Sequence, residues 1–591
     1  MSSPAARSQT IGLLLTGGLC ILPFQLPYHE LPAKTFHAEW LAAALGISAA
    51  LAALAGRPGS VVSWPSPARW LIAFALFLGY QAASGHSVYA QLPLLAVLYV
   101  LYAALMIWLG AQLVNALGIE RVAVTLAGCL LAGALLTALL GSIQFYGRPK
   151  LLEDFVLELY GKRAYGNIAQ VNLYANYLVV GESALLYLWL RGRVPTAYAL
   201  AALTLLVFGC ALAGSRSTLL YLAWFAVLAS LTRPGGADPR RFRVLVYSLA
   251  GATLAASIVV PWLNTLFHLG PPDAGWIERT LAPAAPEPRP LLWLTALRLF
   301  AGAPIAGVGI SEFAGAAFDL GLHPSVVKGA DIWTSPHNLP LHLLAETGAV
   351  GTILALGGVG VWGWRIAQRL RHEAHPSVWW IAAAVGVELI HSLIEFPPLW
   401  YTPYLGVTAL LMGVGAATGP PLPAMSRIGR SATTAACVAL AFAAAVMLRD
   451  YLRLHETYVT GTTVTLARPA DAQRDAAIVR DLSRGLMAPI AELWTVLGAS
   501  LDRNDLAAKR AMSARVARYW PTYPVLARHA VFLAFEGDTR EAQRLIEKSL
   551  GTFPHRRDSI IAVLRQAQAA DPDAIEPLLR VAASAPKAAS N

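Results

Sequence analysis

Residues 337–368 read HNLPLHLLAETGAVGTILALGGVGVWGWRIAQ, a polar start followed by a long apolar run. A membrane-spanning helix needs about 20 apolar residues, and this run is longer. His337 therefore stands at the mouth of a predicted span, directly after a long polar segment. Histidine changes charge near neutral pH unaided. Two interpretations are open: an interfacial polar anchor, and a group that meets a lipid-borne and a water-borne molecule together.

The rest of the chain has the composition of a membrane protein. Of its 591 residues, 56% are hydrophobic and 13% are charged, whereas a soluble domain has about 25% charged residues. We therefore predict an all-α polytopic membrane protein with about thirteen transmembrane helices in residues 1–450. Runs of span length centre near residues 18, 47, 76, 103, 132, 181, 204, 224, 253, 352, 386, 408 and 440.

The first apolar segment, near Ile11–Leu26, is followed by no convincing cleavage site, so we interpret it as a span and not as a signal peptide. The cysteines all lie inside apolar runs, which favours core residues over a disulfide framework or a metal site. They are Cys20, Cys129, Cys210 and Cys437.

Lys and Arg fall in every second connection between the predicted spans, which marks those connections as cytoplasmic. The net charge of +11 is explained by this bias and does not indicate nucleic-acid binding. The other connections face the periplasm if the membrane is a bacterial inner membrane. They include the 147–170 loop, the turn Ala213–Ser217 and the long loop 264–336. An odd number of spans places the C-terminal tail in the periplasm too.

The tail, residues 451–591, is predicted to be a helical periplasmic domain, because its charges are nearly balanced and its apolar residues recur at helical spacing. Asp538 and Glu541 have the spacing of a capping box that opens a helix. The stretch Pro521–Pro554 is close in length to a tetratricopeptide repeat. The domain is either TPR-like or an ordinary helical hairpin, and it is a possible surface for protein docking.

Three polar residues in the predicted span near 386 are spaced to share one helix face: Glu388, His391 and Glu395. Ionisable residues inside a membrane usually face a partner or a cavity. They form either a buried network that joins helices or the polar wall of a site that opens to the periplasm. Pro397-Pro398 would end the helix at that surface.

Gln170, Asn172 and Asn176 stand at the outer start of another span. Amide side chains both donate and accept hydrogen bonds, which suits sugar hydroxyls. They also join helices in ordinary membrane proteins. The sequence leaves both interpretations open.

Three arginines lie in predicted periplasmic segments, namely Arg216, Arg279 and Arg289. The guanidinium fork matches phosphate oxygens, so these residues either clamp a pyrophosphate or contact lipid headgroups. The sequence contains no Walker A loop, GxSxG elbow or HExxH motif, and no acidic pair with metal-ligand spacing stands in the periplasmic loops. We therefore predict a site that uses neither a metal nor another cofactor.

Four motifs between residues 160 and 350 resemble, in order and spacing, those of the bacterial O-antigen ligase and O-linked oligosaccharyltransferase superfamily. They are Gly166-Asn167 through Gln170-Val171-Asn172; Ser215-Arg216; Arg289-Pro290 with Trp293 and Pro304-Ile305-Ala306-Gly307-Val308-Gly309; and His337-Asn338 with Glu346-Thr347-Gly348 and Gly351. The segment 391–397, HSLIEFP, with Trp400-Tyr401 is similar to the signature of PglL-type protein O-oligosaccharyltransferases. The second proline, Pro398, departs from that signature.

The resemblance implies a GT-C-like helical membrane fold and transfer of a preassembled glycan from undecaprenyl pyrophosphate. The acceptor would be a Ser or Thr hydroxyl of a periplasmic protein, often a pilin, and backside displacement would invert the anomeric centre. His337 would act as the base or orient the acceptor, while Arg216 and Arg289 would bind the pyrophosphate. The other expected substrate-binding residues are Gln170, Asn172, Arg279, Asn338, Glu388, His391, Glu395 and Tyr401.

Three other functions stay open. An O-antigen ligase would use the same donor with a lipid A-core acceptor, and a glycan polymerase would extend a glycan. The soluble tail and the 391–401 segment favour a protein acceptor. A transporter of lipid-linked sugars usually shows internal repeats with sites at the membrane midplane, whereas here the polar groups cluster toward one face.

Overall fold

The computed structural model describes residues 4–56, 61–232, 238–271, 287–322, 332–372, 375–460, 463–464 and 480–585. Within these residues the secondary structure is helical apart from one short strand pair and an isolated β-bridge between Val62 and Ala424. In the strand pair, β1 (Val459–Thr460) is antiparallel to β2 (Thr463–Val464). The predicted all-helical class is confirmed.

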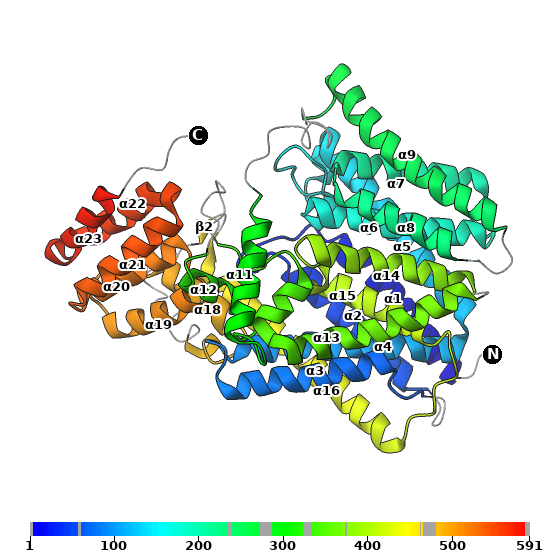
Figure 1. The fold of residues 1–591 in the computed structure, drawn as a ribbon, viewed down its shortest axis with the longest axis horizontal. Coiled ribbons are helices and arrows are strands. Elements are labelled where there is room, and N and C mark those ends of the chain that lie inside the picture. Colours follow the sequence, from blue (N-terminus) through cyan, green and yellow to red (C-terminus); the bar gives the residue numbers. More distant parts are fainter. Residues whose placement is uncertain are drawn as a thin grey trace.

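The apolar part of the chain forms a bundle of long helices, which fills the centre and right of Figure 1. Its helices are α1 (Pro4–Ile21), α2 (Phe36–Leu54), α3 (Ser66–Ser84), α4 (Gln91–Leu117), α5 (Ile119–Tyr146), α6 (Val171–Leu190), α7 (Thr196–Ala213), α8 (Ser217–Leu231), α9 (Pro239–Leu266), α13 (Leu339–Arg371), α14 (Pro376–Ile394), α15 (Thr402–Ala416) and α16 (Arg427–Tyr458). Among the described residues, nine helices are long and apolar enough to cross a membrane, and α8 and α15 are shorter apolar helices. The count of thirteen spans stays a prediction.

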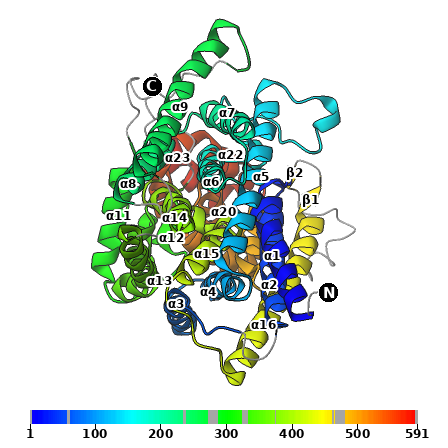
Figure 2. The ribbon, with the colours of Figure 1, turned by 90° about the vertical axis from the view of Figure 1, so that its right-hand side faces the viewer.

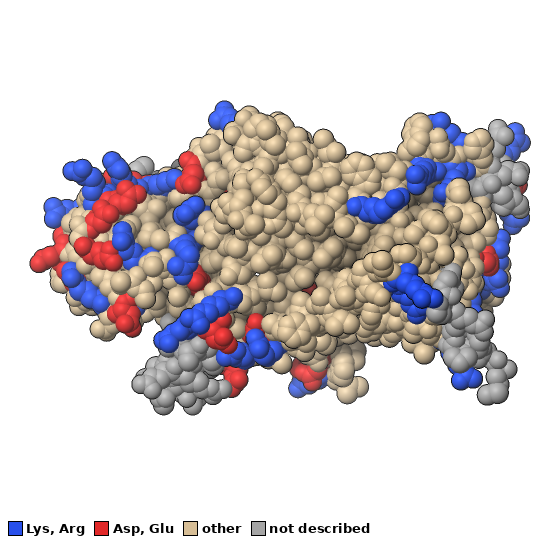
Figure 3. All heavy atoms as spheres, turned by 90° about the horizontal axis from the view of Figure 1, so that it is seen from below, with Lys and Arg blue, Asp and Glu red and all other residues tan. Residues whose placement is uncertain are grey.

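The distribution of charge agrees with a membrane protein. On the face drawn in Figure 3, a broad uncharged band separates two charged ends. Lys and Arg predominate at one end, and both signs of charge mix at the other. Hydrocarbon requires such a band, because charged side chains are costly inside a bilayer.

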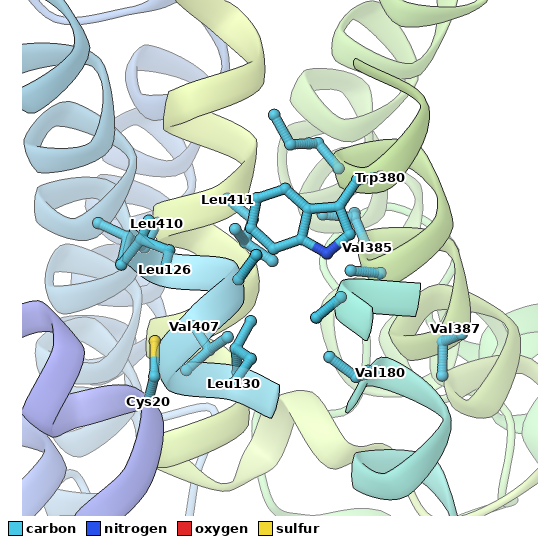
Figure 4. Packing of buried hydrophobic residues seen from close by; sticks show 14 of the residues in the cluster. Cys20, Leu126, Leu130, Val180, Trp380, Val385, Val387, Val407, Leu410 and Leu411 are labelled. Carbon is cyan, nitrogen blue, oxygen red and sulfur yellow. The ribbon is translucent and has the colours of Figure 1, made fainter. Parts of the chain in front are cut away.

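The largest hydrophobic core lies inside the helix bundle. Trp380 of α14 is fully buried there, in one cluster with Leu126 and Leu130 of α5 and with Val407 of α15 (Figure 4). Cys20 belongs to the same cluster. All four cysteines are free, and three of them are buried, which agrees with their interpretation as core residues.

A backbone joint kinks α13 near its N-terminal end. Gly348 lies inside this helix but has φ 62° and ψ −167°, a conformation that is not helical. The segment 304–309 lies against the kink, and the N–H of Ala349 donates to the carbonyl of Pro304 at 2.8 Å. The two motifs 304–309 and 346–348 are therefore two halves of one structural unit.

The joint leaves no room for a side chain at Gly348. A Cβ there would lie 2.4 Å from the carbonyl carbon of Ile305, and the positive φ is itself a conformation that favours glycine. A second backbone bond, from the N–H of Val308 to the carbonyl of Ala345 at 2.9 Å, holds the segment against α13. The start of α13 is thus fixed by backbone contacts.

The predicted loop 264–336 is largely structured where it is described. It contains α11 (Arg289–Gly302) and α12 (Phe313–Asp319). Both helices pack against the first part of α13 in a small cluster of apolar residues that includes Leu292, Phe313 and Ala345. The described part of the loop therefore packs beside the first part of α13.

The C-terminal tail folds into helical hairpins, as its periodicity predicts. α16 is continuous through residue 450, the predicted boundary, so the compact helical unit begins later in the chain. Its helices are α18 (Ala488–Gly498), α19 (Leu506–Tyr519), α20 (Tyr523–Phe535), α21 (Thr539–Thr552), α22 (Arg557–Gln568) and α23 (Pro572–Ser584). Asp538 caps α21 by accepting from the N–H of Glu541 at 3.4 Å.

These helices cover one end of the bundle, as Figures 1 and 2 both show. Glu492 of α18 accepts hydrogen bonds from Tyr89 at 2.7 Å and from Arg515 at 2.6 Å. Lys548 of α21 lies 3.0 Å from Asp319 of α12. The C-terminal unit therefore touches both the helix bundle and the structured loop.

We predict that Gly348→Ala destabilises the protein by about 1–3 kcal/mol, because it adds a clash to a positive φ. Gly360→Ala is the matched control, since Gly360 lies in the same helix and its added Cβ would meet nothing within 4 Å. Melting temperatures in detergent check this prediction. Equal melting temperatures for the two variants would show that the joint does not constrain α13.

Candidate functional site

Glu395 is the centre of a polar cluster at the end of the bundle where α6 and α13 begin. α14 ends at Ile394, and Glu395 follows with an extended backbone. One carboxylate oxygen lies 2.5 Å from Nδ1 of His337. The other accepts from Arg289 at 2.9 Å and from the amide of Asn172 at 3.1 Å. Three predicted site residues from distant parts of the chain thus meet on one carboxylate.

Asn338 positions His337 within this cluster. Its side chain caps α13 by accepting from the N–H of Leu341 at 3.0 Å, and it donates to the carbonyl of Leu393 at 2.9 Å. His337 has φ 54°, which is uncommon for a residue other than glycine. Such strain persists only where the surroundings enforce it and is concentrated at functional sites. In this structure Asn338 therefore has a structural role, because its hydrogen bonds hold the backbone beside His337 in place.

The two described arginines are held in different ways. Arg289 spans two carboxylates, because it also lies 3.6 Å from Glu287. Arg216 is exposed at the start of α8, and the structure shows no ion pair for it among the described residues. Its neighbour Ser215 donates to Asn172 at 2.9 Å, so Arg216 stands one residue from the cluster. Arg279 lies outside the described residues.

The charges around Glu395 keep it ionised. Burial raises the pKa of Glu395, but the hydrogen bond with His337, the charge of Arg289 and the N–H of Phe396 outweigh it and lower the pKa to about 2. A carboxylate that accepts from Nδ1 fixes the tautomer of an imidazole and stabilises the imidazolium. Nε2 of His337 is then the nitrogen that can take a proton. The pair has the geometry of a general base with its orienting acid.

Glu388 and His391 belong to a separate network, deeper between α6, α8 and α14. The amide of Asn176 donates to Glu388 at 3.2 Å and lies 3.3 Å from Nδ1 of His391. Tyr221 lies 2.6 Å from the same nitrogen. All four side chains are buried. Glu388, His391 and Glu395 were expected to share one helix face, but only Glu388 and His391 do. α14 ends at Ile394, so Glu395 lies outside the helix and joins the cluster with His337 and Arg289.

Gln170 and Tyr401 line a cavity of about 730 Å³, whose lining also includes polar side chains such as Asn167 and Tyr165. The side chain of Gln170 caps α6 by accepting from the N–H of Leu173 at 2.5 Å. Tyr401 follows the turn that contains Pro398, with its ring 6.0 Å from that of Phe396. The described lining of this cavity does not include Glu395, His337 or Arg289. Gln170 also has a structural role as the cap of α6.

A second imidazole–carboxylate pair escaped the sequence analysis. Nε2 of His342 lies 2.8 Å from Glu346, and both side chains are buried within α13. The other oxygen of Glu346 accepts from the N–H of Phe313 at 3.0 Å. The spacing of four residues on one helix face was a usable signal. No group of three or more His, Cys, Asp or Glu residues suited to a metal ion occurs in the described part of the chain.

Comparisons with known proteins confirm the resemblance seen in the sequence. A family model described as O-antigen ligase matches residues 200–356, which include Arg289 and His337. A model described as the C-terminal part of a virulence factor membrane-bound polymerase matches residues 379–568, which include Glu395. A general O-oligosaccharyltransferase of Acinetobacter baylyi is 27% identical over 428 residues, covering 70% of this chain and 71% of that protein.

The lowered pKa of Glu395 leads to a prediction about stability. An unfolded glutamate has a pKa near 4.3, so the ionised side chain contributes stability that is fully present above about pH 4.3 and is lost as the pH falls toward 2. We expect Glu395→Gln to lose less melting temperature than the wild type between pH 5 and pH 2.5. Glu547→Gln, at an exposed position of α21, is the control. Parallel curves for all three proteins would contradict the role of these ion pairs.

Proposed function

We propose that this chain, which matches the O-antigen ligase and polymerase C-terminal family models, is a membrane glycosyltransferase. It moves a preassembled glycan from undecaprenyl pyrophosphate to a Ser or Thr hydroxyl of a periplasmic protein, such as a pilin. The observation that carries the proposal is the meeting of His337, Glu395 and Arg289 at the outer end of the helix bundle. A base and a phosphate-binding fork are the two groups that such a transfer needs.

In the proposed reaction the acceptor hydroxyl gives its proton to Nε2 of His337 while its oxygen attacks the anomeric carbon. The bond between that carbon and the pyrophosphate oxygen breaks, and the pyrophosphate leaves with the electron pair. Glu395 stabilises the imidazolium. Arg289 and the exposed Arg216 stabilise the charge that develops on the leaving group. The displacement inverts the anomeric centre, and arginine charge takes the place of a metal ion.

The proposed location is the bacterial inner membrane, with the cluster and the C-terminal helices on the periplasmic side. This orientation places the Lys- and Arg-rich connections in the cytoplasm, as the positive-inside rule requires. The polar cavity beside Gln170 and Tyr401 would hold sugars of the glycan, since hydroxyl and amide groups line it. The C-terminal helices would present a docking surface to the protein acceptor.

Two specific findings bear on the choice of acceptor. The Acinetobacter baylyi relative is named an O-oligosaccharyltransferase and covers most of this chain, which favours a protein acceptor. The two family models carry the names of a ligase and a polymerase, which keep a glycolipid or glycan acceptor as the second candidate. A purified enzyme given lipid-linked glycan with either a pilin or lipid A-core decides between them.

We predict that His337→Ala lowers the initial rate of glycan transfer by about 10²–10⁴-fold, the usual contribution of a general base. His372→Ala, at an exposed position after α13, should keep the wild-type rate. The rate is measured in vitro with both variants inserted in the membrane and melting normally. Near-normal transfer by His337→Ala would remove the base from the mechanism.

We also predict that Arg216→Lys slows transfer, because an ammonium group cannot reproduce the two-pronged contact with phosphate. Arg427→Lys, at an exposed position at the start of α16, provides the matched control. The expected loss is about tenfold or more in kcat/KM for the donor, the cost of one hydrogen bond to a charged group. If kcat/KM for the donor were unchanged, Arg216 would be assigned to contact with lipid headgroups.

A further inference from the structure

Three chain segments at the candidate site are joined to one another by side-chain hydrogen bonds. The helices α6, α8 and α14 pack against one another (Figure 1). Asn172 in the first turn of α6 donates to Glu395, just after α14, at 3.1 Å. The same amide group accepts from Ser215, just before α8, at 2.9 Å. We call Asn172, Ser215 and Glu395 the end layer, because they lie where these helices begin or end.

A second set of polar side chains repeats these connections further along the same helices. This deep layer consists of Asn176 of α6, Tyr221 of α8 and His391 of α14, and all three side chains are fully buried. Asn176 follows Asn172 by four residues, and His391 precedes Glu395 by four residues. The two layers are therefore about one helical turn apart.

The hydrogen bonds of the deep layer converge on Nδ1 of His391. The amide nitrogen of Asn176 lies 3.3 Å from it, and the hydroxyl of Tyr221 lies 2.6 Å from it. The same amide nitrogen donates to Glu388 at 3.2 Å, so it is an N–H group and Nδ1 has to accept. Tyr221 is then the second donor to Nδ1, and the proton of the neutral ring is on Nε2. The network thus fixes the tautomer of His391 and the direction of the Tyr221 hydroxyl.

The hydroxyl of Tyr221 matters more for the placement of α8 than for holding it in the bundle. Hydrogen bonds between membrane helices add little stability on average. α8 also has a second contact with α14, because the indole N–H of Trp224 donates to the carbonyl of Ala382 at 3.1 Å. Buried polar networks specify one arrangement of the elements that they join. Loss of the hydroxyl should therefore shift the start of α8 without releasing the helix.

Arg216 lies between the two layers in the sequence, directly after Ser215 and five residues before Tyr221. It is exposed, and the structure shows no ion pair for its guanidinium among the described residues. Its location therefore depends on the backbone at the start of α8. We propose that Tyr221 and His391 are positioning residues, which hold the start of α8 where Arg216 meets the diphosphate of the donor. The inference rests on the proposed function, which assigns Arg216 to that diphosphate.

Binding of inorganic pyrophosphate to the full-length protein in detergent tests this proposal. Isothermal titration calorimetry measures the affinity without glycan or acceptor, and inorganic sulfate serves as the comparison anion. Tyr221→Phe removes the hydroxyl and keeps the ring. Tyr187→Phe is the matched control, because Tyr187 is equally buried near the other end of α6 and stacks on Trp380 of α14. Its hydroxyl has no hydrogen-bond partner among the described residues.

We expect Tyr221→Phe and His391→Leu to weaken pyrophosphate binding about two- to tenfold, the effect of one hydrogen bond. His391→Gln should retain most of the affinity, because its amide oxygen can accept from Tyr221. Tyr187→Phe should bind like the wild type. Wild-type affinity in Tyr221→Phe, an equal loss in Tyr187→Phe, or a wild-type protein that binds sulfate as well as pyrophosphate would overturn the proposal.

A double-mutant cycle separates the positioning of Arg216 from a general loss of structure. If Tyr221 acts through Arg216, Tyr221→Phe should have a much smaller effect in an Arg216→Lys protein, where the guanidinium fork is already absent. The same loss in both backgrounds would show that Tyr221 supports only the fold, and it would refute the inference even in a protein that transfers glycan. Because no transfer is measured, coupled losses in a protein that transfers nothing would refute the proposed function and leave the positioning of Arg216 standing.

Discussion

The backbone joint between segment 304–309 and the kinked α13 determines where the candidate site forms. Gly348 has a positive φ and leaves the carbonyl of Ile305 no space for a side chain beside it. Hydrogen bonds between main-chain atoms then hold the first part of α13 against segment 304–309. Because these contacts involve backbone atoms and not flexible side chains, they fix the position of His337, which lies just before α13.

Glu395 provides the charged group that joins His337 to the rest of the site. It follows α14, yet it binds His337 across 58 residues and Asn172 across 223 residues of sequence. A single carboxylate, just after the end of α14, therefore ties together the starts of α6, α11 and α13. Burial alone would favour its neutral form, and the positive groups around it reverse that preference.

Much of this arrangement could be predicted from the sequence, and the exceptions have physical reasons. Apolar runs predict helices because hydrophobicity is local, and Asp538 predicts the start of α21 because a cap lies within one turn. The expected common face of Glu388, His391 and Glu395 assumed an unbroken helix, but α14 ends at Ile394. The His342–Glu346 pair was detectable from its four-residue spacing. The meeting of Arg289 and His337 on Glu395 depends instead on packing between segments far apart in the sequence, which no local pattern records.

The double engagement of Arg289 has a consequence for selectivity. In the structure its guanidinium is already neutralised by Glu287 and Glu395, so an arriving ligand has to replace a counter-ion that is present beforehand. A neutral sugar has no negative charge with which to replace a carboxylate beside Arg289, whereas a diphosphate has. In the proposed function, the cluster would therefore distinguish a charged carrier from free carbohydrate by charge, before any sugar hydroxyl is recognised.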